Sequence, residues 1–144
     1  MPVEDERRVI VVGVDGSRHA EAALAWAFRQ AELTCAPLVA VTCWEYPMNL
    51  GWTPGPPADF RPDEDARSML EEAVAEEQRH HPDVAVEKVV VEGPPVPVLL
   101  DAAAGAALLV VGTRGHGGFA GLLLGSVSGH CMTHAACPVV VVRH

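Results

Sequence analysis

A glycine-dense stretch over residues 112–128 holds the residue types best suited to bind an anion. It reads GTRGHGGFAGLLLGSVS and follows a short, wholly apolar run. Successive backbone N–H groups in such a loop can surround an anion. Gly125 and Ser126 then begin a predicted helix, and the free N–H groups and dipole of a helix N-terminus attract phosphate. The stretch therefore predicts a phosphate site, with Ser126 and Ser128 as hydroxyl donors and Arg114 as a nearby positive charge.

Several features of this loop have a second interpretation. Arg114 could contact a phosphate or be an ordinary solvated loop residue. His116 could touch a phosphate or respond to pH, or it could simply lie exposed. The glycines could be turn residues and nothing more. Two known phosphate-binding motifs do not choose between these interpretations. The P-loop pattern G-x-x-x-x-G-K-[ST] is absent. The dinucleotide fingerprint follows the first strand of its fold, whereas this loop follows the fourth predicted strand.

The overall charge restricts how the chain could attract an anion. It carries 10 Lys and Arg against 19 Asp and Glu, which gives a formal net charge of −9. The basic residues are scattered, with no run longer than Arg7-Arg8. This argues against general nucleic-acid binding and against an anionic membrane surface as partner. An anionic ligand must be held locally, by backbone N–H groups or by one or two placed cations.

Length and composition fit one compact unit. The chain has 144 residues, of which 49% are hydrophobic, enough to build a core. The first residues lack the basic-then-apolar pattern of a signal peptide, and the four cysteines form no C-x-x-C pair. We therefore expect a single cytoplasmic domain over residues 1–144 with free thiols.

Apolar strands and amphipathic helices alternate along the chain. The predicted strands span residues 9–14, 38–44, 84–91, 107–111 and 139–142. The predicted helices span residues 20–33, 62 onward, 96–106 and 126–136, and residues 47–62 predict a loop. Right-handed crossovers make this pattern an α/β fold with a parallel sheet and helices on both faces. Because ligands bind at the carboxyl ends of such strands, Asp15-Gly16-Ser17 and the glycine loop are expected to wall one cleft.

The spacing of the glycines is the more specific signal. The pattern G-x2-G-x9-G-S is formed by Gly112, Gly115, Gly125 and Ser126. With this pattern the chain resembles the ATP-binding branch of the universal stress protein family. Residues 12–17, 93–95 and 136–143 also look like the corresponding segments of that family. The resemblance covers nearly the whole chain.

The resemblance implies a fold and an assembly. The fold is Rossmann-like and similar to the adenine nucleotide alpha hydrolases. It is a single open five-stranded parallel sheet of strand order 3-2-1-4-5 with helices on both faces. Members are usually dimeric, so a homodimer through the C-terminal strand at 138–142 is implied here.

The resemblance also implies roles for individual residues. Asp15 would sit near the ribose with Gly13 beside it, and the backbone around Cys43 would contact adenine. Gly112 would approach the ribose and phosphates, and the glycines and serines further along would hold the phosphates. The full set of candidate nucleotide contacts is Gly13, Asp15, Cys43, Gly112, Thr113, Arg114, Gly115, His116, Gly117, Gly118, Gly125, Ser126, Val127 and Ser128.

The implied function is nucleotide-dependent regulation or signalling in a stress response. The ligand would be ATP, or ADP or AMP in its place, with Mg²⁺ as an optional companion. No G-x-S-x-G elbow is present, and no carboxylate pair at strand ends stands out beyond Asp15 and Glu45. We therefore expect little or no turnover and assign no catalytic residue. The alternatives are a slow metal-dependent ATPase or phosphotransferase, and a dimeric interaction module that uses no nucleotide.

One further pair of residues has ligand spacing. His130 and His134 lie four residues apart on the last predicted helix, which could place both on one face as a metal pair. The H-E-x-x-H arrangement is absent, and no third ligand is evident from the sequence. The sequence alone favours surface or interface histidines, so no metal site is predicted.

Overall fold

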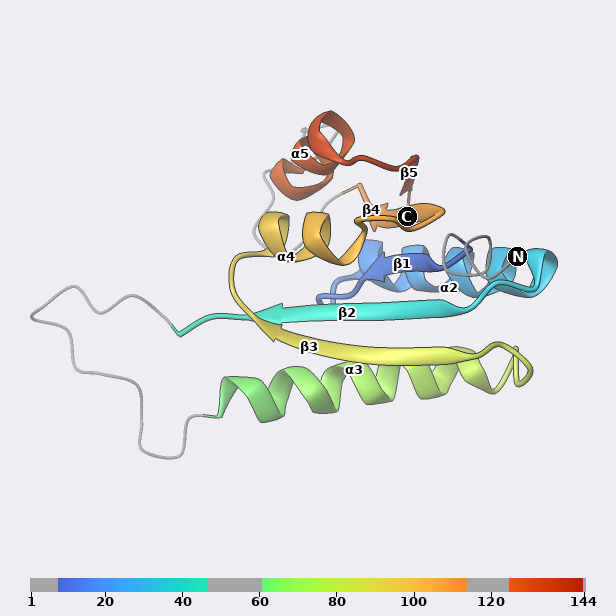
Figure 1. The fold of residues 1–144 in the computed structure, drawn as a ribbon. Helices are drawn as coiled ribbons and strands as arrows, with labels where there is room; N and C mark the ends of the chain where they lie inside the picture. Colours follow the sequence, from blue (N-terminus) through green and yellow to red (C-terminus); the bar gives the residue numbers. More distant parts are fainter. Residues whose placement is uncertain (1–7, 47–60, 114–124, 144) are drawn as a thin grey trace, which may run out of the picture.

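The computed structural model describes residues 8–46, 61–113 and 125–143, along which strands and helices alternate (Figure 1). The strands are β1 (Ile10–Gly13), β2 (Leu38–Trp44), β3 (Val86–Glu92), β4 (Leu108–Gly112) and β5 (Val139–Val142). The helices are α2 (Arg18–Thr34), α3 (Pro62–Gln78), α4 (Pro95–Ala102) and α5 (Ser126–His134). The predicted alternation of strands and helices is confirmed.

All five strands belong to one parallel sheet of order β3-β2-β1-β4-β5, as expected. β1 lies in the centre, where Ile10 is opposite Leu38 on β2 and Leu108 on β4. The strand order reverses at β1, because β2 and β3 extend to one side and β4 and β5 to the other. Such a reversal opens a crevice at the carboxyl ends of the strands. In this chain the crevice lies where β1 and β4 end, at Gly13 and Gly112.

Neighbouring residues of the central strand point to opposite faces of the sheet and build two cores. Val12 packs in one buried cluster with Leu24 of α2, and α3 contributes to the same cluster. Val11 packs in the other with Leu99 of α4 and Cys131 of α5. α2 and α3 thus pack on one face and α4 and α5 on the other; in Figure 1, where the strands run from β3 at the bottom to β5 at the top, α3 lies beside β3 and α5 beside β5. Helices therefore cover both faces, as the sequence predicts.

The turn between β1 and α2 is held by its own hydrogen bonds. Ser17 is the N-cap of α2, and its Oγ accepts a hydrogen bond from the N–H of Ala20 at 3.1 Å. Asp15 Oδ1 accepts a hydrogen bond from the N–H of Ser17 at 2.9 Å. Gly16 between them has a φ of 83°, a conformation that glycine adopts readily. These contacts hold Asp15 at the carboxyl edge of the sheet.

Two helices end earlier than the sequence predicts. α4 ends at Ala102 because Gly105 takes a positive φ of 78° and the chain turns into β4. α5 ends at His134, and Ala135 is already extended with a ψ of 141°. Pro138 follows closely, and a proline disfavours helical backbone in the residue before it. At both places the turn that follows ends the helix before the residue that the sequence predicts.

The four cysteines all lie in the described residues and are free thiols, as expected. Across the described ranges, no helix combines the length and apolarity needed to cross a bilayer.

Candidate functional site

A cavity of about 370 Å³ lies at the carboxyl ends of the central strands, where the strand order reverses. Its walls come from the ends of β1, β2 and β4 with the residues that follow them, from α4 and the turn before it, and from the start of α5. The predicted contacts that line it are Gly13, Asp15, Cys43, Gly112, Gly125, Ser126, Val127 and Ser128. The turn after β1 and the residues that flank the glycine loop thus wall one cavity, as expected.

The middle of the glycine loop is not part of this description. The predicted contacts that lie outside the described residues are Arg114, Gly115, His116, Gly117 and Gly118. Their roles at a phosphate stay predictions.

Gly112 ends β4 where that strand meets the first turn of α2. A Cβ added to Gly112 would lie 2.6 Å from both the carbonyl carbon and the carbonyl oxygen of His19. A side chain there would push α2 away from the sheet, because close-packed backbone cannot absorb such an overlap. The sequence resemblance assigns Gly112 to the close approach of a ligand. The structure adds a second reason for glycine, which is packing against His19.

Thr113 is buried and joins three neighbouring segments. Its N–H donates a hydrogen bond to the carbonyl oxygen of Val142 on β5 at 3.0 Å. Its Oγ1 lies 3.0 Å from Nδ1 of His19 on α2. Its carbonyl oxygen accepts hydrogen bonds from the N–H of Gly125 at 2.6 Å and from the hydroxyl of Ser128 at 2.9 Å. Thr113 is not among the described residues that line the cavity, so its visible role is to hold the wall together.

Helix α5 begins at the cavity, which its first residues line. Gly125 is the N-cap, with extended backbone at φ −74° and ψ 167°. The N–H of Gly129 bonds to the carbonyl oxygen of Gly125 at 3.0 Å and is the first to close a helical turn. The N–H groups of Ser126, Val127 and Ser128 come before it and have no partner within the helix ladder. An anion at this wall would meet those N–H groups and the positive end of the helix dipole.

The hydroxyl of Ser128 is hydrogen-bonded within the protein. Ser128 is only 2% exposed, and its Oγ lies 2.9 Å from the Thr113 carbonyl oxygen and 3.1 Å from that of Gly125. A hydroxyl has one proton to donate, and both of these neighbours are acceptors. The Ser128 hydroxyl is therefore already engaged within the protein, and its contact with a phosphate stays a prediction. Its backbone N–H is the group that can still serve a ligand, and Ser126 remains exposed at the cavity.

The charged side chains on the described wall, Asp15 and Glu45, are both acidic. Cys43 lies on the same wall. Burial raises the pKa of the Cys43 thiol, and the negative charges of Glu45 and Asp15 raise this pKa further. The thiol is therefore protonated near neutral pH and is a poor nucleophile. This acidic end of the cavity suits an uncharged part of a ligand, and the α5 end suits an anionic part.

Sequence reasoning missed the part of the wall that comes from α4 and the turn before it. Gly93, Pro95, Val98 and Leu99 line the cavity and give it an apolar side. A Cβ added to Gly13 would lie 3.1 Å from Cδ2 of Leu99, so the glycine makes room for this wall. The available signal was position, because this turn follows the carboxyl end of β3, at the edge of the sheet where ligands bind.

Comparison with known protein families shows to which family the chain belongs. The family model described as the universal stress protein family matches residues 6–143. The chain belongs to the universal stress protein family. A universal stress protein of Mycolicibacterium smegmatis (strain ATCC 700084 / mc(2)155) is 40% identical over 141 residues, which cover 96% of this chain and 47% of that protein. The chain spans about half the length of the curated universal stress proteins it matches.

Solved structures of universal stress proteins share the fold. A crystal structure of a universal stress protein in complex with cAMP superposes with a TM-score of 0.72 at 28% identity, covering 95% of this chain and 97% of that one. The universal stress protein of Archaeoglobus fulgidus in complex with dAMP gives a TM-score of 0.63 at 26% identity, covering 93% and 96%.

Proposed function

We propose that this universal stress protein binds an adenine nucleotide, ATP foremost, in the cavity at the carboxyl edge of its sheet. The observation that carries the proposal is the start of α5, where Ser126, Val127 and Ser128 line the cavity and carry N–H groups that the helix leaves unbonded. The solved relatives in complex with cAMP and dAMP support the choice of ligand. Both of these ligands combine adenine, a sugar and a phosphate.

The polarity of the wall supports one orientation of the nucleotide. The phosphates would lie at the start of α5, because its N–H groups and dipole favour negative charge. The ribose would lie near Asp15 and Gly13, and the base near Cys43. Asp15 and Glu45 would repel phosphates placed at their end, and the apolar side of Leu99 suits a base.

We further propose that binding, and not turnover, is what the protein uses, as a regulatory signal in a cytoplasmic stress response. Fast phosphoryl transfer needs groups that position a water molecule and a cation at the phosphates. Of the wall's carboxylates, Asp15 already accepts a hydrogen bond from the N–H of Ser17. Cys43 is protonated near neutral pH, because its pKa is raised. A protonated thiol cannot act as a general base, and Asp15 is engaged in the turn before α2.

A homodimer through residues 138–142 belongs to the same proposal. β5 is the last strand of the sheet, and its four valines are all partly exposed. An apolar edge strand offers unpaired backbone groups to a second chain. A second copy pairing there would cover this edge.

The decisive experiment begins with nucleotide analysis of freshly purified protein after denaturation. Mass spectrometry should find ATP or its products at close to one per chain. Titration calorimetry of the emptied protein should then show one site for ATP, with ADP, AMP and cAMP as comparisons. An empty protein that ignores all four nucleotides would overturn the proposal. If the protein releases phosphate from ATP in the presence of Mg²⁺, and Asp15→Ala does not, the protein is a slow ATPase and the proposed regulatory role is overturned.

A further inference from the structure

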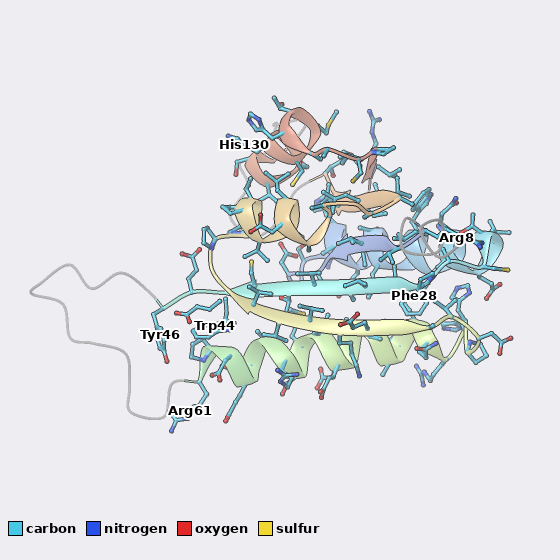
Figure 2. The ribbon with its side chains drawn as sticks, in the orientation of Figure 1. Arg8, Phe28, Trp44, Tyr46, Arg61 and His130 are labelled. Carbon is cyan, nitrogen blue, oxygen red and sulfur yellow. The ribbon has the colours of Figure 1, made fainter. Side chains whose placement is uncertain are left out.

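Two exposed histidines share one face of α5, away from the nucleotide cavity. His130 and His134 lie four residues apart, with ring centroids separated by 6.2 Å and ring planes inclined by 21°. Figure 2 shows His130 projecting from α5 on the side that points away from the sheet. The i, i+4 spacing is the one through which two helical histidines bind zinc in H-E-x-x-H sites.

The hydrogen bonding of His130 prepares it to act as a ligand. Its Nδ1 lies 2.6 Å from the carbonyl oxygen of Ser126. A carbonyl oxygen only accepts hydrogen bonds, so in the neutral ring Nδ1 carries the proton and Nε2 keeps its lone pair. Histidines that bind metals characteristically donate their other ring N–H to a carbonyl or carboxylate, which fixes tautomer and orientation. His130 has this arrangement before any metal arrives.

The surface beside His130 leaves room for further ligands. A shallow hollow of about 200 Å³ is lined by Ser126, Gly129, His130 and Thr133. A Cβ added to Gly129 would meet nothing within 4 Å, so the hollow is not crowded. Water molecules bound to an ion could occupy this space. Among the described residues, no group of three or more His, Cys, Asp or Glu side chains could hold a metal ion, so water must complete the coordination.

We propose that His130 and His134 chelate a late first-row divalent ion, Cu²⁺, Ni²⁺ or Zn²⁺, on the outer face of α5. Nε2 of His130 is one ligand and a ring nitrogen of His134 is the other, reached by rotation of that exposed side chain. Imidazole nitrogen suits these three ions, and Cu²⁺ binds more tightly than Ni²⁺ or Zn²⁺ at a given set of ligands. Neither histidine lines the nucleotide cavity, so the proposal can be tested on nucleotide-free protein.

The test uses untagged, nucleotide-free protein and calorimetric titration with Ni²⁺ and Cu²⁺ in a non-coordinating buffer. His130→Ala and His134→Ala should each weaken the tightest site by about tenfold or more, which corresponds to about 1.4 kcal/mol. His80→Ala is the matched control, because His80 is exposed and has no histidine four residues away. That variant should bind as wild type does. Unchanged affinity in His130→Ala and His134→Ala would overturn the proposal.

A second variant keeps the number of histidines and changes only their spacing. His134→Ala combined with Met132→His places the two rings at i and i+2, on different sides of the helix. Met132 is 52% exposed, so the substitution disturbs no core. This double variant should bind as weakly as His134→Ala, and wild-type affinity in it would contradict chelation.

Nitrogen-15 spectra of the histidine rings should show Zn²⁺ shifting Nε2 of His130. A shift at Nδ1 instead would contradict the assigned tautomer.

Discussion

The hydroxyl of Ser128 donates a hydrogen bond to the carbonyl oxygen of Thr113 at 2.9 Å and so joins the two ends of the glycine loop. The N–H of Gly125 reaches the same carbonyl oxygen at 2.6 Å. The residues that close the loop are therefore fixed on both sides of it. This contact places the start of α5 beside the end of β4, where the cavity lies.

Replacing Ser128 with alanine tests that junction. Ser128→Ala removes one of the two hydrogen bonds to the Thr113 carbonyl, so we expect a loss of about 1 kcal/mol in the free energy of unfolding. Nucleotide affinity should fall as well, because α5 is less firmly placed. Urea denaturation and calorimetry measure the two effects. Ser126→Ala, at an exposed position, serves as the control and should leave stability unchanged.

A methyl group at Gly112 should be far more costly than one at Gly129. Gly112→Ala would bring a Cβ to 2.6 Å from the backbone of His19, and overpacking of this kind costs roughly 1 to 3 kcal/mol. Gly129→Ala meets no atom within 4 Å and should gain up to about 1 kcal/mol from helix propensity. Thermal unfolding of both variants checks the sign. Equal effects at the two positions would show that the close approach to His19 has been overrated.

The proposed role of Asp15 can be separated from its role in the turn. Asp15→Asn keeps an oxygen for the N–H of Ser17, whereas Asp15→Ala removes it. If Asp15 accepts a hydrogen bond from the ribose, wild type should bind one of 2′-deoxy-ATP and 3′-deoxy-ATP about tenfold more weakly than ATP. Asp15→Ala should lose this preference. A preference that survives in Asp15→Ala would place the ribose elsewhere.

Cys43 should react slowly with iodoacetamide at neutral pH. Burial, then Glu45 and Asp15, raise the pKa of its thiol, so the reactive thiolate forms only at alkaline pH. The alkylation rate should rise with pH through the ordinary cysteine range and beyond it. Asp15→Asn removes one negative charge and should lower this pKa, which speeds alkylation at a given pH. Peptide mass spectrometry follows the modification, and a rate in Asp15→Asn equal to that of wild type would contradict the charge effect.

The proposed dimer edge can be blocked without disturbing the sheet. Pro138 and Val142 direct their carbonyl groups to β4, so by alternation the backbone groups of Val141 point outward. Val141→Pro removes an outward N–H and should leave a folded monomer, since proline is tolerated at a sheet edge. Sedimentation over a range of concentrations distinguishes monomer from dimer. If Val141→Pro dimerises as tightly as wild type, the dimer interface does not lie at β5.

The fold could be predicted because its signals are local. The run from Ile10 to Gly13 is apolar throughout, which predicts a buried strand, and Ser17 is a strong N-cap, which predicts the start of a helix. Each of these elements can therefore be predicted from its own residues. The ends of α4 and α5 were predicted too late. The left-handed φ of Gly105 and the extended Ala135 serve the approach to the next strand, which local composition does not reveal.

The site was predictable in its position but less so in its details. The glycine and serine residues of the G-x2-G-x9-G-S pattern predicted where α5 begins. The hydrogen-bond partners of Thr113 include His19 and Val142, which are distant in sequence, and no pattern around Thr113 points to them. Leu99 was missed for a similar reason, since its place in the cavity wall depends on how α4 crosses the sheet.

The wall of the cavity is assembled from stretches around residues 13, 43, 95, 112 and 126, so it exists only when the whole domain is folded. A ligand bound there has no partial site to occupy in the unfolded chain. It therefore raises the free energy of unfolding of the entire domain by RT ln(1 + [L]/Kd), about 2.7 kcal/mol when the ligand is at about one hundred times Kd. The lifetime of the folded protein would then follow the supply of its ligand, and depletion of that ligand would expose the chain to proteolysis.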